Sequence, residues 1–357
     1  MAIFQSIALL STLAASVHAG FNTGSKSNVV VYWGQNSAGQ QSTQTRLADY
    51  CNDSNIDVLL LSFLLRFNGA GGQPVLNFAN QGDKCSVFPG TETFSCPEIE
   101  ADIKTCQGKG KTIMLSLGGD SYNEGGYTSA AAATAGAEKL WAQFGPVQSG
   151  SSVRTKTSLF RNSLPIHLAL RPFGTAVLDG FDFDFEANVA NMATFGNRLR
   201  SLYSTSTSKK YFLSAAPQCP YPDAYNRDIL DNVPLDFINV QFYNNYCGVN
   251  SYVPGATDQW NFNFAQWDTF ARASKNPAVK ILLGVPAAQR AAGSGYLSPS
   301  QLAPVIQYSG RFASFGGVMM WDASQAFTNS GFLSAVKSSL TSLRKRSMKW
   351  GVRAAEE

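Results

Sequence analysis

Three carboxylates alternate with two phenylalanines in the stretch Asp182-Phe183-Asp184-Phe185-Glu186. Successive side chains of a β-strand point to opposite faces, so a strand places the three acids on one face and the aromatic rings on the other. A water-facing sheet could alternate in this way, but like charges on one face repel each other and Asp is disfavoured in strands. Carboxylates are common acid–base catalysts. The stretch therefore predicts a strand whose acidic face lines an active site and whose aromatic face packs toward outer helices.

The acidic strand belongs to a regular alternation of apolar strands and helices along the chain. We expect strands at residues 28–33, 56–63, 111–117, 177–186, 211–216, 237–243, 280–285 and 315–321. We expect helices at residues 43–52, 97–107, 130–144, 192–203, 264–274, 298–308 and 332–343. Most of the strands are continuous apolar runs, which are typical of parallel strands covered on both faces.

Eight strands that alternate with helices predict an α/β fold, a TIM (β/α)8 barrel that forms a single catalytic domain over residues 20–343. A doubly wound open sheet is the alternative, but no GxGxxG motif follows the first strand. In a barrel, the chemistry sits at the carboxyl ends of the strands. Those ends carry polar and aromatic residues here, namely Trp33, Gln35, Glu186, Gln218, Gln241, Tyr243, Asn244, Trp321 and Asp322, together with Gly119.

Length and charge limit the classes of partner. The chain has 357 residues, of which 44% are hydrophobic and 15% are charged, so it can bury a large core. The formal charge is +4, and residues 344–357 form a basic tail with five basic residues against two acidic ones. The body of the chain is therefore nearly neutral, and nothing indicates a nucleic-acid partner or an acidic substrate.

Residues 1–19 are typical of a secretory signal peptide. The largely apolar run Ile7–Ala15 precedes Val17-His18-Ala19, which fits a small-x-small cleavage site before Gly20. This run is too short for a transmembrane span, which needs about 20 apolar residues, and no other stretch qualifies. We expect a secreted protein, extracellular or in a cell wall, whose mature chain begins near Gly20.

The six cysteines are an even number, which in an exported protein predicts three disulfide bonds, although their spacing leaves the pairing open. A metal site is disfavoured because no CxxC pair is present and the two histidines, His18 and His167, are badly placed. One acceptor sequence for N-glycosylation, Asn52-Asp53-Ser54, is present.

Five motifs in the right order resemble family 18 of the glycoside hydrolases, the chitinases. The first is Asp179-x-x-Asp182-x-Asp184-x-Glu186, and the second is Ser116-x-Gly118-Gly119. The class III branch, of plant and fungal type, is indicated by Tyr32-Trp33-Gly34-Gln35-Asn36, by Ala216-Pro217-Gln218-Cys219-Pro220-Tyr221-Pro222-Asp223 and by Gln241-Phe242-Tyr243-Asn244-Asn245. The resemblance spans about residues 28–340, and it too implies a barrel.

The resemblance also implies a mechanism. Most retaining glycosidases use a carboxylate nucleophile, whereas in this family the 2-acetamido carbonyl of the substrate attacks the anomeric carbon. Glu186 is then the general acid and later the base. Asp184 binds the acetamido N–H, and Asp182 shares a proton with it, so the three acids titrate as a coupled set. Tyr243 donates its hydroxyl to the acetamido oxygen, and no metal ion or organic cofactor is needed.

The resemblance further implies a set of substrate-binding residues, namely Tyr32, Gln241, Trp321, Asn244 and Gly119. Trp321 forms an apolar floor under the distorted sugar, and Tyr32 and Gln241 line the same subsite. Three of them have a structural alternative: a buried Trp321 in the core, an Asn244 that satisfies backbone groups, and a Gly119 that permits close backbone approach. For Tyr32 the choice between binding and core is closer.

The disulfide pairs implied by the resemblance are Cys51–Cys106, Cys85–Cys96 and Cys219–Cys247. Asp179 is expected to be structural, a hydrogen-bond partner at the strand end. Residues 154–170 depart from the family pattern as an extra segment, which we interpret as retained intron sequence or, alternatively, as a genuine surface insertion. Either way, we expect it in a loop at the bottom of the barrel, away from the site.

We therefore expect a monomeric, endo-acting chitinase whose partner is chitin or a chito-oligosaccharide. Two alternatives remain. An endo-β-N-acetylglucosaminidase that acts on glycoprotein glycans would use the same acids. A carbohydrate-binding, lectin-like protein of this fold would usually lack the acid, whereas Glu186 is present here.

Overall fold

The computed structural model describes residues 20–147 and 170–343. The expected signal peptide, the basic tail at 344–357 and the extra segment, except for Leu170, lie outside the described residues.

Eight parallel strands close into a barrel, as predicted. They are β1 (Asn28–Trp33), β2 (Val58–Arg66), β6 (Thr112–Gly119), β7 (Gly180–Phe185), β8 (Phe212–Ala215), β9 (Phe237–Gln241), β10 (Lys280–Pro286) and β11 (Phe315–Trp321). Each strand pairs with the next in this order, and β1 pairs with both β2 and β11, which closes the ring. The closure excludes the open doubly wound sheet.

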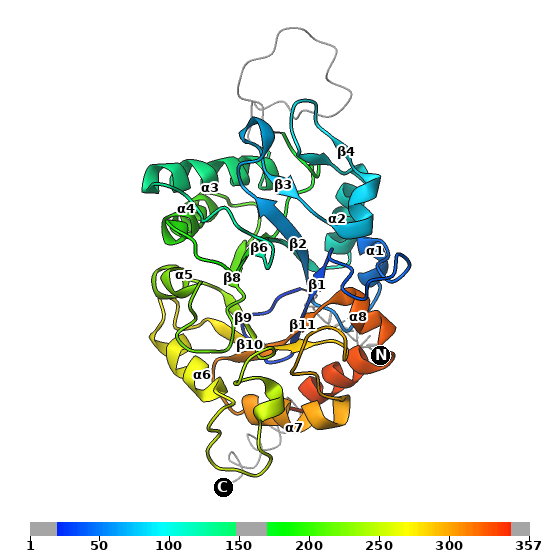
Figure 1. The fold of residues 1–357 in the computed structure, drawn as a ribbon, viewed down its shortest axis with the longest axis vertical. Helices are drawn as coiled ribbons and strands as arrows, with labels where there is room; N and C mark the ends of the chain where they lie inside the picture. The colour runs from blue at the N-terminus through cyan, green and yellow to red at the C-terminus, as the bar shows by residue number, and fades with distance from the viewer. Residues whose placement is uncertain (1–19, 148–169, 344–357) are drawn as a thin grey trace, which may run out of the picture.

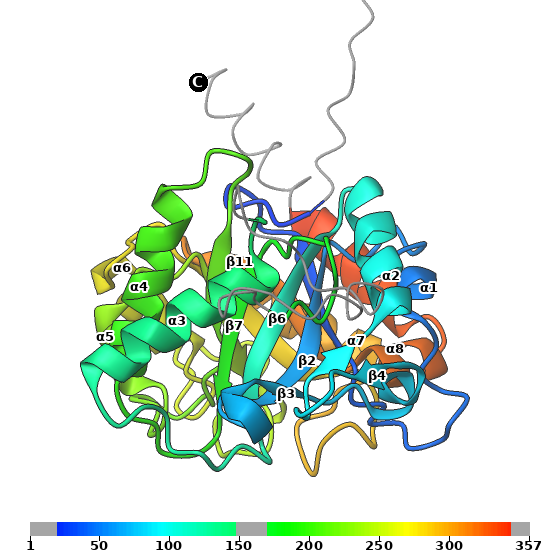
Figure 2. The same ribbon diagram turned by 90° about the horizontal axis from the view of Figure 1, so that it is seen from above.

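Helices surround the barrel on its outside (Figures 1 and 2). They are α1 (Leu47–Tyr50), α2 (Pro97–Gly108), α3 (Ala130–Phe144), α4 (Met192–Ser204), α5 (Arg227–Asn232), α6 (Phe264–Ala273), α7 (Pro299–Ser309), α8 (Ala323–Thr328) and a last helical run at 332–343. The short α5 and α8 were not expected from the sequence. The N-termini of α3 and α8 are capped by the side chains of Ser129 and Asp322, which accept backbone N–H groups of the first turn.

The first expected helix is much shorter than its sequence pattern indicated. Residues 43–52 were expected to be helical, but α1 covers only Leu47–Tyr50. The reason is the side chain of Gln44, which accepts the backbone N–H groups of Gly34 and Asn36 at 3.0 and 2.9 Å. This polar residue is thereby committed to the loop after β1 instead of a helix.

The long loop between β2 and α2 folds back on the barrel. It contains β3 (Val75–Leu76), antiparallel to β2, and a small hairpin of β4 (Ser86–Val87) and β5 (Phe94–Ser95). Short 3-10 turns lie at Ala70–Gly72, Ala79–Lys84 and, after β9, Val249–Ser251. All three expected disulfide bonds are formed: Cys51–Cys106, Cys85–Cys96 and Cys219–Cys247.

The hydrophobic core has two parts, one inside the barrel and one between barrel and helices. Phe181, Phe183 and Phe185 belong to the outer part, as expected. The ring of Phe183 meets that of Phe195 on α4 edge to face, with 6.2 Å between ring centroids. The aromatic face of β7 thus anchors the strand against the helix layer and turns its acids inward.

Asp179 lies at the opposite end of β7 from the acids and has the structural role expected of it. Its carboxylate accepts the backbone N–H of Ile113 on β6 at 2.8 Å and pairs with Lys209 at 2.6 Å. Two other acids that precede strands form the same contacts. Asp57, before β2, accepts the N–H of Val29 on β1 and pairs with Lys337. Asp236, before β9, accepts the N–H of Leu213 on β8 and pairs with Arg200. These pairs tie neighbouring strands together at the bottom of the barrel.

Candidate active site

Asp182 is fully buried inside the barrel and is surrounded by hydrogen-bond donors. Strand register places Ser116 on β6 and Ser214 on β8 at either side of it. Their hydroxyls donate to its carboxylate at 2.7 and 2.5 Å, the Tyr32 hydroxyl on β1 donates at 2.8 Å, and the Asn239 amide on β9 donates at 3.3 Å. Burial raises the pKa of Asp182, and the hydrogen bonds oppose that rise.

Asp184 and Glu186 are joined through the side chain of Gln241. Its amide nitrogen donates to Asp184 Oδ1 at 3.1 Å and lies 3.5 Å from Glu186 Oε1, and it also donates to the carbonyl of Ala216 at 3.0 Å. Asp184 is buried and Glu186 is half-buried, directly after the end of β7. The alternation of the strand therefore brings both acids to the top of the barrel, as predicted.

The environment favours the protonated forms of both acids. Burial raises the pKa of Asp184 well above its usual range, and the charges of Glu186 and Asp182 add to the effect. Burial also raises the pKa of Glu186. Nearby Asp120 and Asp223 act in the same direction, against hydrogen bonds from Gln241 and Gln218. A carboxyl group that keeps its proton close to neutral pH is what a general acid requires.

The hydrogen bonds of Asp182 bear on the expectation that it shares a proton with Asp184. Among the described residues, its bonds go to Tyr32, Ser116, Ser214 and Asn239, and none joins it to Asp184. Charge couples the two acids, since Asp182 helps to raise the pKa of Asp184. A proton shared between them stays a prediction.

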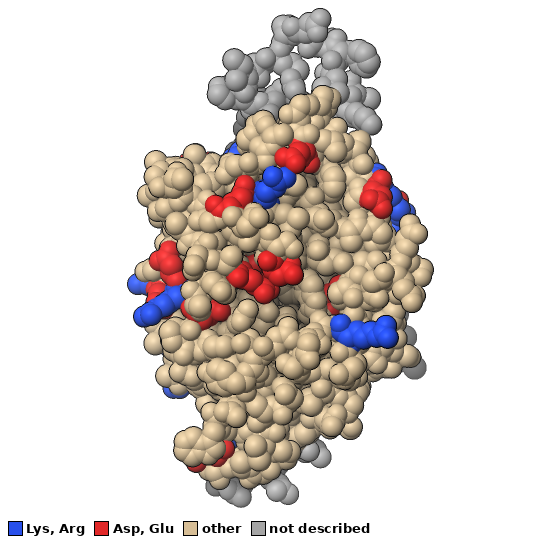
Figure 3. All heavy atoms as spheres, in the orientation of Figure 1, with Lys and Arg blue, Asp and Glu red and all other residues tan. Residues whose placement is uncertain are grey.

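A cavity of about 390 Å³ opens above these acids and holds most of the expected site residues. Among its lining residues are Tyr32, Asp184, Glu186, Gln241, Tyr243, Asn244 and Trp321. Figure 3 shows acidic side chains gathered beside a hollow near the middle of the molecular face. Asp182 is not among the lining residues, which agrees with an indirect role through its neighbours.

Aromatic side chains form one wall of the cavity. The Trp321 ring lies 5.4 Å from the ring of Tyr32 and stacks on Phe63 at 6.0 Å, between ring centroids. Trp321 is partly exposed to the cavity, in contrast to Trp33, which is 1% exposed and belongs to the core. Burial and the charges of Asp184 and Glu186 raise the pKa of Tyr243 well above its usual range, so its hydroxyl stays protonated and can donate.

Two of the expected substrate-binding residues have clear structural roles. A Cβ on Gly119, whose φ is 87°, would lie 2.8 Å from the Phe63 ring, and Gly119 does not line the cavity. The structure thus supports the close-approach alternative for Gly119. Asn244 lines the cavity and also exchanges hydrogen bonds with the backbone of Ser294, at 3.0 and 3.2 Å.

A model of the family described as glycosyl hydrolases family 18 matches residues 28–298. The chain is 51% identical over 341 residues to Endochitinase 33 of Trichoderma harzianum, and the match covers 95% of this chain and 100% of that protein. It is 48% identical over 333 residues to a class III chitinase of Arthroderma benhamiae, covering 93% and 91% of the two chains. The chain belongs to glycosyl hydrolase family 18. The resemblance inferred from the motifs and the expectation of a glycosidase are confirmed.

A similar fold occurs in a solved structure of a protein that is named as an inhibitor. A solved structure of a xylanase-alpha-amylase inhibitor protein, XAIP-I, in complex with trehalose, matches with a TM-score of 0.67 and 29% identity, and the match covers 87% of this chain and 97% of that one. The shared fold therefore does not establish catalysis by itself. The argument for catalysis therefore rests on the arrangement of Asp184, Glu186 and Gln241.

Sequence reasoning missed several residues of this family 18 site. Ser214 and Asn239 are polar residues at inward positions of apolar strands, a signal that could have been noticed. Asp120 lines the cavity one residue beyond Gly119 and was overlooked because the motif ends there. Phe63 also lines the cavity and could not have been singled out, since it ends an apolar run like any core residue.

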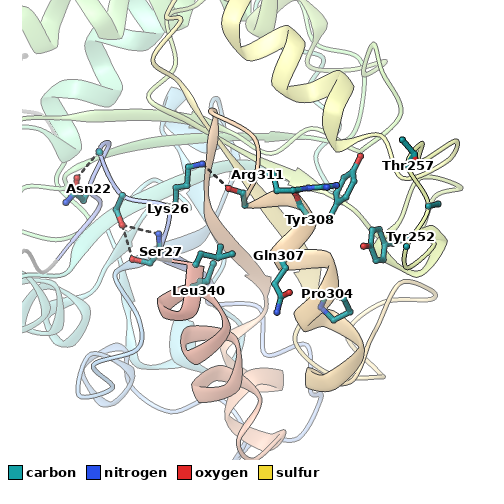
Figure 4. A pocket seen from close by; sticks show the side chains of 16 residues that line it. Asn22, Lys26, Ser27, Tyr252, Thr257, Pro304, Gln307, Tyr308, Arg311 and Leu340 are labelled. Atoms are coloured by element: carbon teal, nitrogen blue, oxygen red, sulfur yellow. Dashed lines mark hydrogen bonds between the residues drawn. The ribbon is translucent and has the colours of Figure 1, made fainter. Parts of the chain in front are cut away.

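A larger cavity, of about 1040 Å³, lies elsewhere, between the segment before β1, the loop after β9, α7 and the last helix (Figure 4). Its wall includes Tyr308, over whose ring the Arg311 guanidinium lies at 4.4 Å, and Lys26, which donates to the Gly310 carbonyl. The described residues that line it include no Asp, Glu or His. Its described wall therefore offers no carboxyl group, and the smaller cavity, which holds Asp184 and Glu186, is the candidate active site of this family 18 chain.

No group of three or more His, Cys, Asp or Glu within residues 20–147 and 170–343 is arranged to hold a metal ion. In the same ranges, no helix has the length and apolar character that a membrane span needs.

Proposed function

We propose that this protein is a secreted, endo-acting chitinase that hydrolyses β-1,4 bonds between N-acetylglucosamine units with retention of configuration. The observation that carries the proposal is the contact of one Gln241 amide with both Asp184 and Glu186 at the wall of an open cavity. The two fungal relatives, named an endochitinase and a class III chitinase, support the choice of substrate.

In the first step, the acetamido carbonyl oxygen of the substrate attacks the anomeric carbon while the bond to the leaving oxygen breaks. Glu186, protonated in its half-buried position, transfers its proton to that leaving oxygen. The product is an oxazolinium ion, which is stabilised by Asp184 as it accepts a hydrogen bond from the acetamido N–H. The Tyr243 hydroxyl orients the acetamido oxygen for the attack.

In the second step, the Glu186 carboxylate takes a proton from water, and the water oxygen attacks the anomeric carbon. The ring opens back to the acetamide, Glu186 regains its proton, and two inversions give net retention. Trp321 supports the apolar face of the sugar, and Tyr32 and Gln241 hold Asp182 and Asp184 in place. Three disulfide bonds agree with export to an oxidising compartment.

The test is hydrolysis of chito-oligosaccharides by the wild type and by Glu186→Gln, with the anomer of the first product read by NMR. We expect β-anomer products from the wild type and a loss of at least about a thousandfold in kcat for the variant. Glu138→Gln, on the outer helix α3, is the matched control and should keep full activity. An inverted product, or an active Glu186→Gln, would refute the mechanism.

A binding role without catalysis is the second candidate, because the XAIP-I structure shows the same fold in a protein named as an inhibitor. The two are separated by the same assay: a folded wild type that binds chito-oligosaccharides and releases no product would support it. Release of glycans from a glycoprotein, without cleavage of chitin oligomers, would instead indicate an endo-β-N-acetylglucosaminidase.

A further inference from the structure

A further carboxylate reaches the catalytic cavity from the strand beside β7. Asp120 directly follows β6, which pairs in parallel with β7 and sets Gly118 opposite Asp184. Two residues further along both strands, the same register sets Asp120 beside Glu186. Asp120 and Glu186 are thus the first residues after the paired ends of β6 and β7, which are Gly119 and Phe185. Both residues line the same cavity, so their side chains reach the same space.

None of the described residues forms an ion pair that would neutralise the charge of Asp120. Its side chain is exposed, and its hydrogen bond comes from the hydroxyl of the adjacent Ser121, at 2.9 Å. Within residues 20–147 and 170–343, Asp120 takes part in no ion pair, and no Lys, Arg or His is among the residues that line the cavity. Its negative charge therefore acts on the cavity without a counter-charge from the described wall.

Asp223, the other acid that acts on Glu186 from a neighbouring loop, differs in kind. It is 3% exposed, and its carboxylate accepts the backbone N–H groups of Gln218, Tyr225 and Asn226 at 3.0, 3.0 and 2.5 Å. Its charge is thus used to hold the loop after β8. Of these two acids, Asp120 is the one whose charge has no evident structural use.

We propose that Asp120 is a positioning residue for the hydrolysis, the cross-strand neighbour whose negative charge keeps the proton on Glu186 until the glycosidic oxygen accepts it. The inference rests on the proposed function and assigns to it a residue outside the family motifs quoted above. Asp120 acts through Glu186 and needs no contact with the reacting atoms. The physical basis is that a like charge nearby disfavours ionisation of a carboxyl group.

The other groups that face Glu186 do not take over the effect of the Asp120 charge. They are Asp184 from β7, Gln218 and Asp223 from the loop after β8, and Gln241 and Tyr243 from β9 and its end. Gln241 and Gln218 donate hydrogen bonds and so favour the ionised form of Glu186, while Asp120 raises the pKa of both Glu186 and Asp184. Removing the Asp120 charge should therefore lower the pKa of Glu186 and favour its ionised form.

The test is the pH dependence of kcat/KM for Asp120→Asn on chito-oligosaccharides. The alkaline limb, which reports loss of the proton from Glu186, should move to lower pH by about half a unit to one unit at low ionic strength. Because Asp120 is exposed, added salt should shrink the shift. Asp120→Glu, which keeps the charge, should restore the wild-type limb. Asp83→Asn, which removes the same charge from an exposed loop outside the cavity, is the matched control and should leave the limb in place.

A second measurement works without turnover. A 13C NMR titration of the Glu186 carboxyl in the wild type and in Asp120→Asn reports the proton directly, and the pKa should be lower in the variant. If the wild type cleaves no chitin oligomer, the proposed function fails while this titration still decides the role of Asp120. An unchanged Glu186 titration in a folded Asp120→Asn would overturn the inference, as would a uniform loss of activity at every pH.

Discussion

The side-chain amide of Gln241 lies 3.1 Å from the carboxylate of Asp184, within hydrogen-bond distance. Gln241 ends β9 and is 6% exposed, so the amide is held by the strand and not by a mobile loop. Because the same nitrogen also lies near Glu186, one rigid group sets the relative position of the general acid and of the carboxylate that handles the acetamide. Precise placement of this kind is worth orders of magnitude in rate.

We expect Gln241→Leu to lower kcat about 10- to 100-fold, since both acids lose a donor that orients them. Loss of a hydrogen bond to the ionised form should also raise the pKa of Glu186, so the alkaline limb of the pH profile should move to higher pH. Steady-state kinetics across pH measure both effects. Gln41→Leu, at an exposed loop position, is the control, and an unaltered kcat in Gln241→Leu would contradict the role given to this amide.

We expect Asp182→Asn to destabilise the fold by about 2 kcal/mol and to reduce activity. The substitution directs an amide N–H₂ toward three hydroxyls and one amide that now donate to a carboxylate, and buried polar groups that lose their partners cost about 1–3 kcal/mol. Urea unfolding followed by tryptophan fluorescence gives the free energy. Ser214→Ala, which removes only one donor, should cost about 1 kcal/mol. Equal stability of Asp182→Asn and the wild type would show that the four donors do not depend on the charge.

We expect Trp321→Ala to lower kcat/KM about 10- to 100-fold, because the sugar would lose an apolar surface worth about 1.5–3 kcal/mol. Trp321→Phe should keep most of the activity, since it retains a ring beside Tyr32 and Phe63. Binding of chito-oligosaccharides, followed by calorimetry, should weaken in parallel. If Trp321→Ala binds and cleaves as well as the wild type, Trp321 serves only the core.

We expect the three disulfide bonds to stabilise the protein in the order of the loops they close. The paired cysteines are separated by 55 residues for Cys51–Cys106, by 28 for Cys219–Cys247 and by 11 for Cys85–Cys96. In the chain-entropy model, a longer loop gains more, and removal of a bond costs about 2–4 kcal/mol. Thermal unfolding of the three double Cys→Ser variants measures the order. A larger loss for Cys85–Cys96 than for Cys51–Cys106 would show that native contacts outweigh loop entropy.

Local pattern was enough for the barrel and for its acidic strand. Continuous apolar runs predicted most of the eight strands, and the two-residue period of β7 correctly placed Asp182 and Asp184 on the inner face and Phe183 on the outer one. The period of a strand is a local property of the backbone, so sequence spacing determines it. The pattern misjudged residues 43–52, where the Gln44 side chain bonds to a distant part of the loop.

The sequence by itself determined which residue types face inward and, through its motifs, the family. The tertiary structure decided which of these residues come into contact. Tyr32 and Asp182 are separated by 150 positions and form a hydrogen bond of 2.8 Å, and Gln241 reaches Asp184 across 57 positions. Asp120 faces Glu186 only because β6 and β7 are neighbours in a given register. Strand order and register are set by closure of the whole barrel, and no local stretch of the chain contains that information.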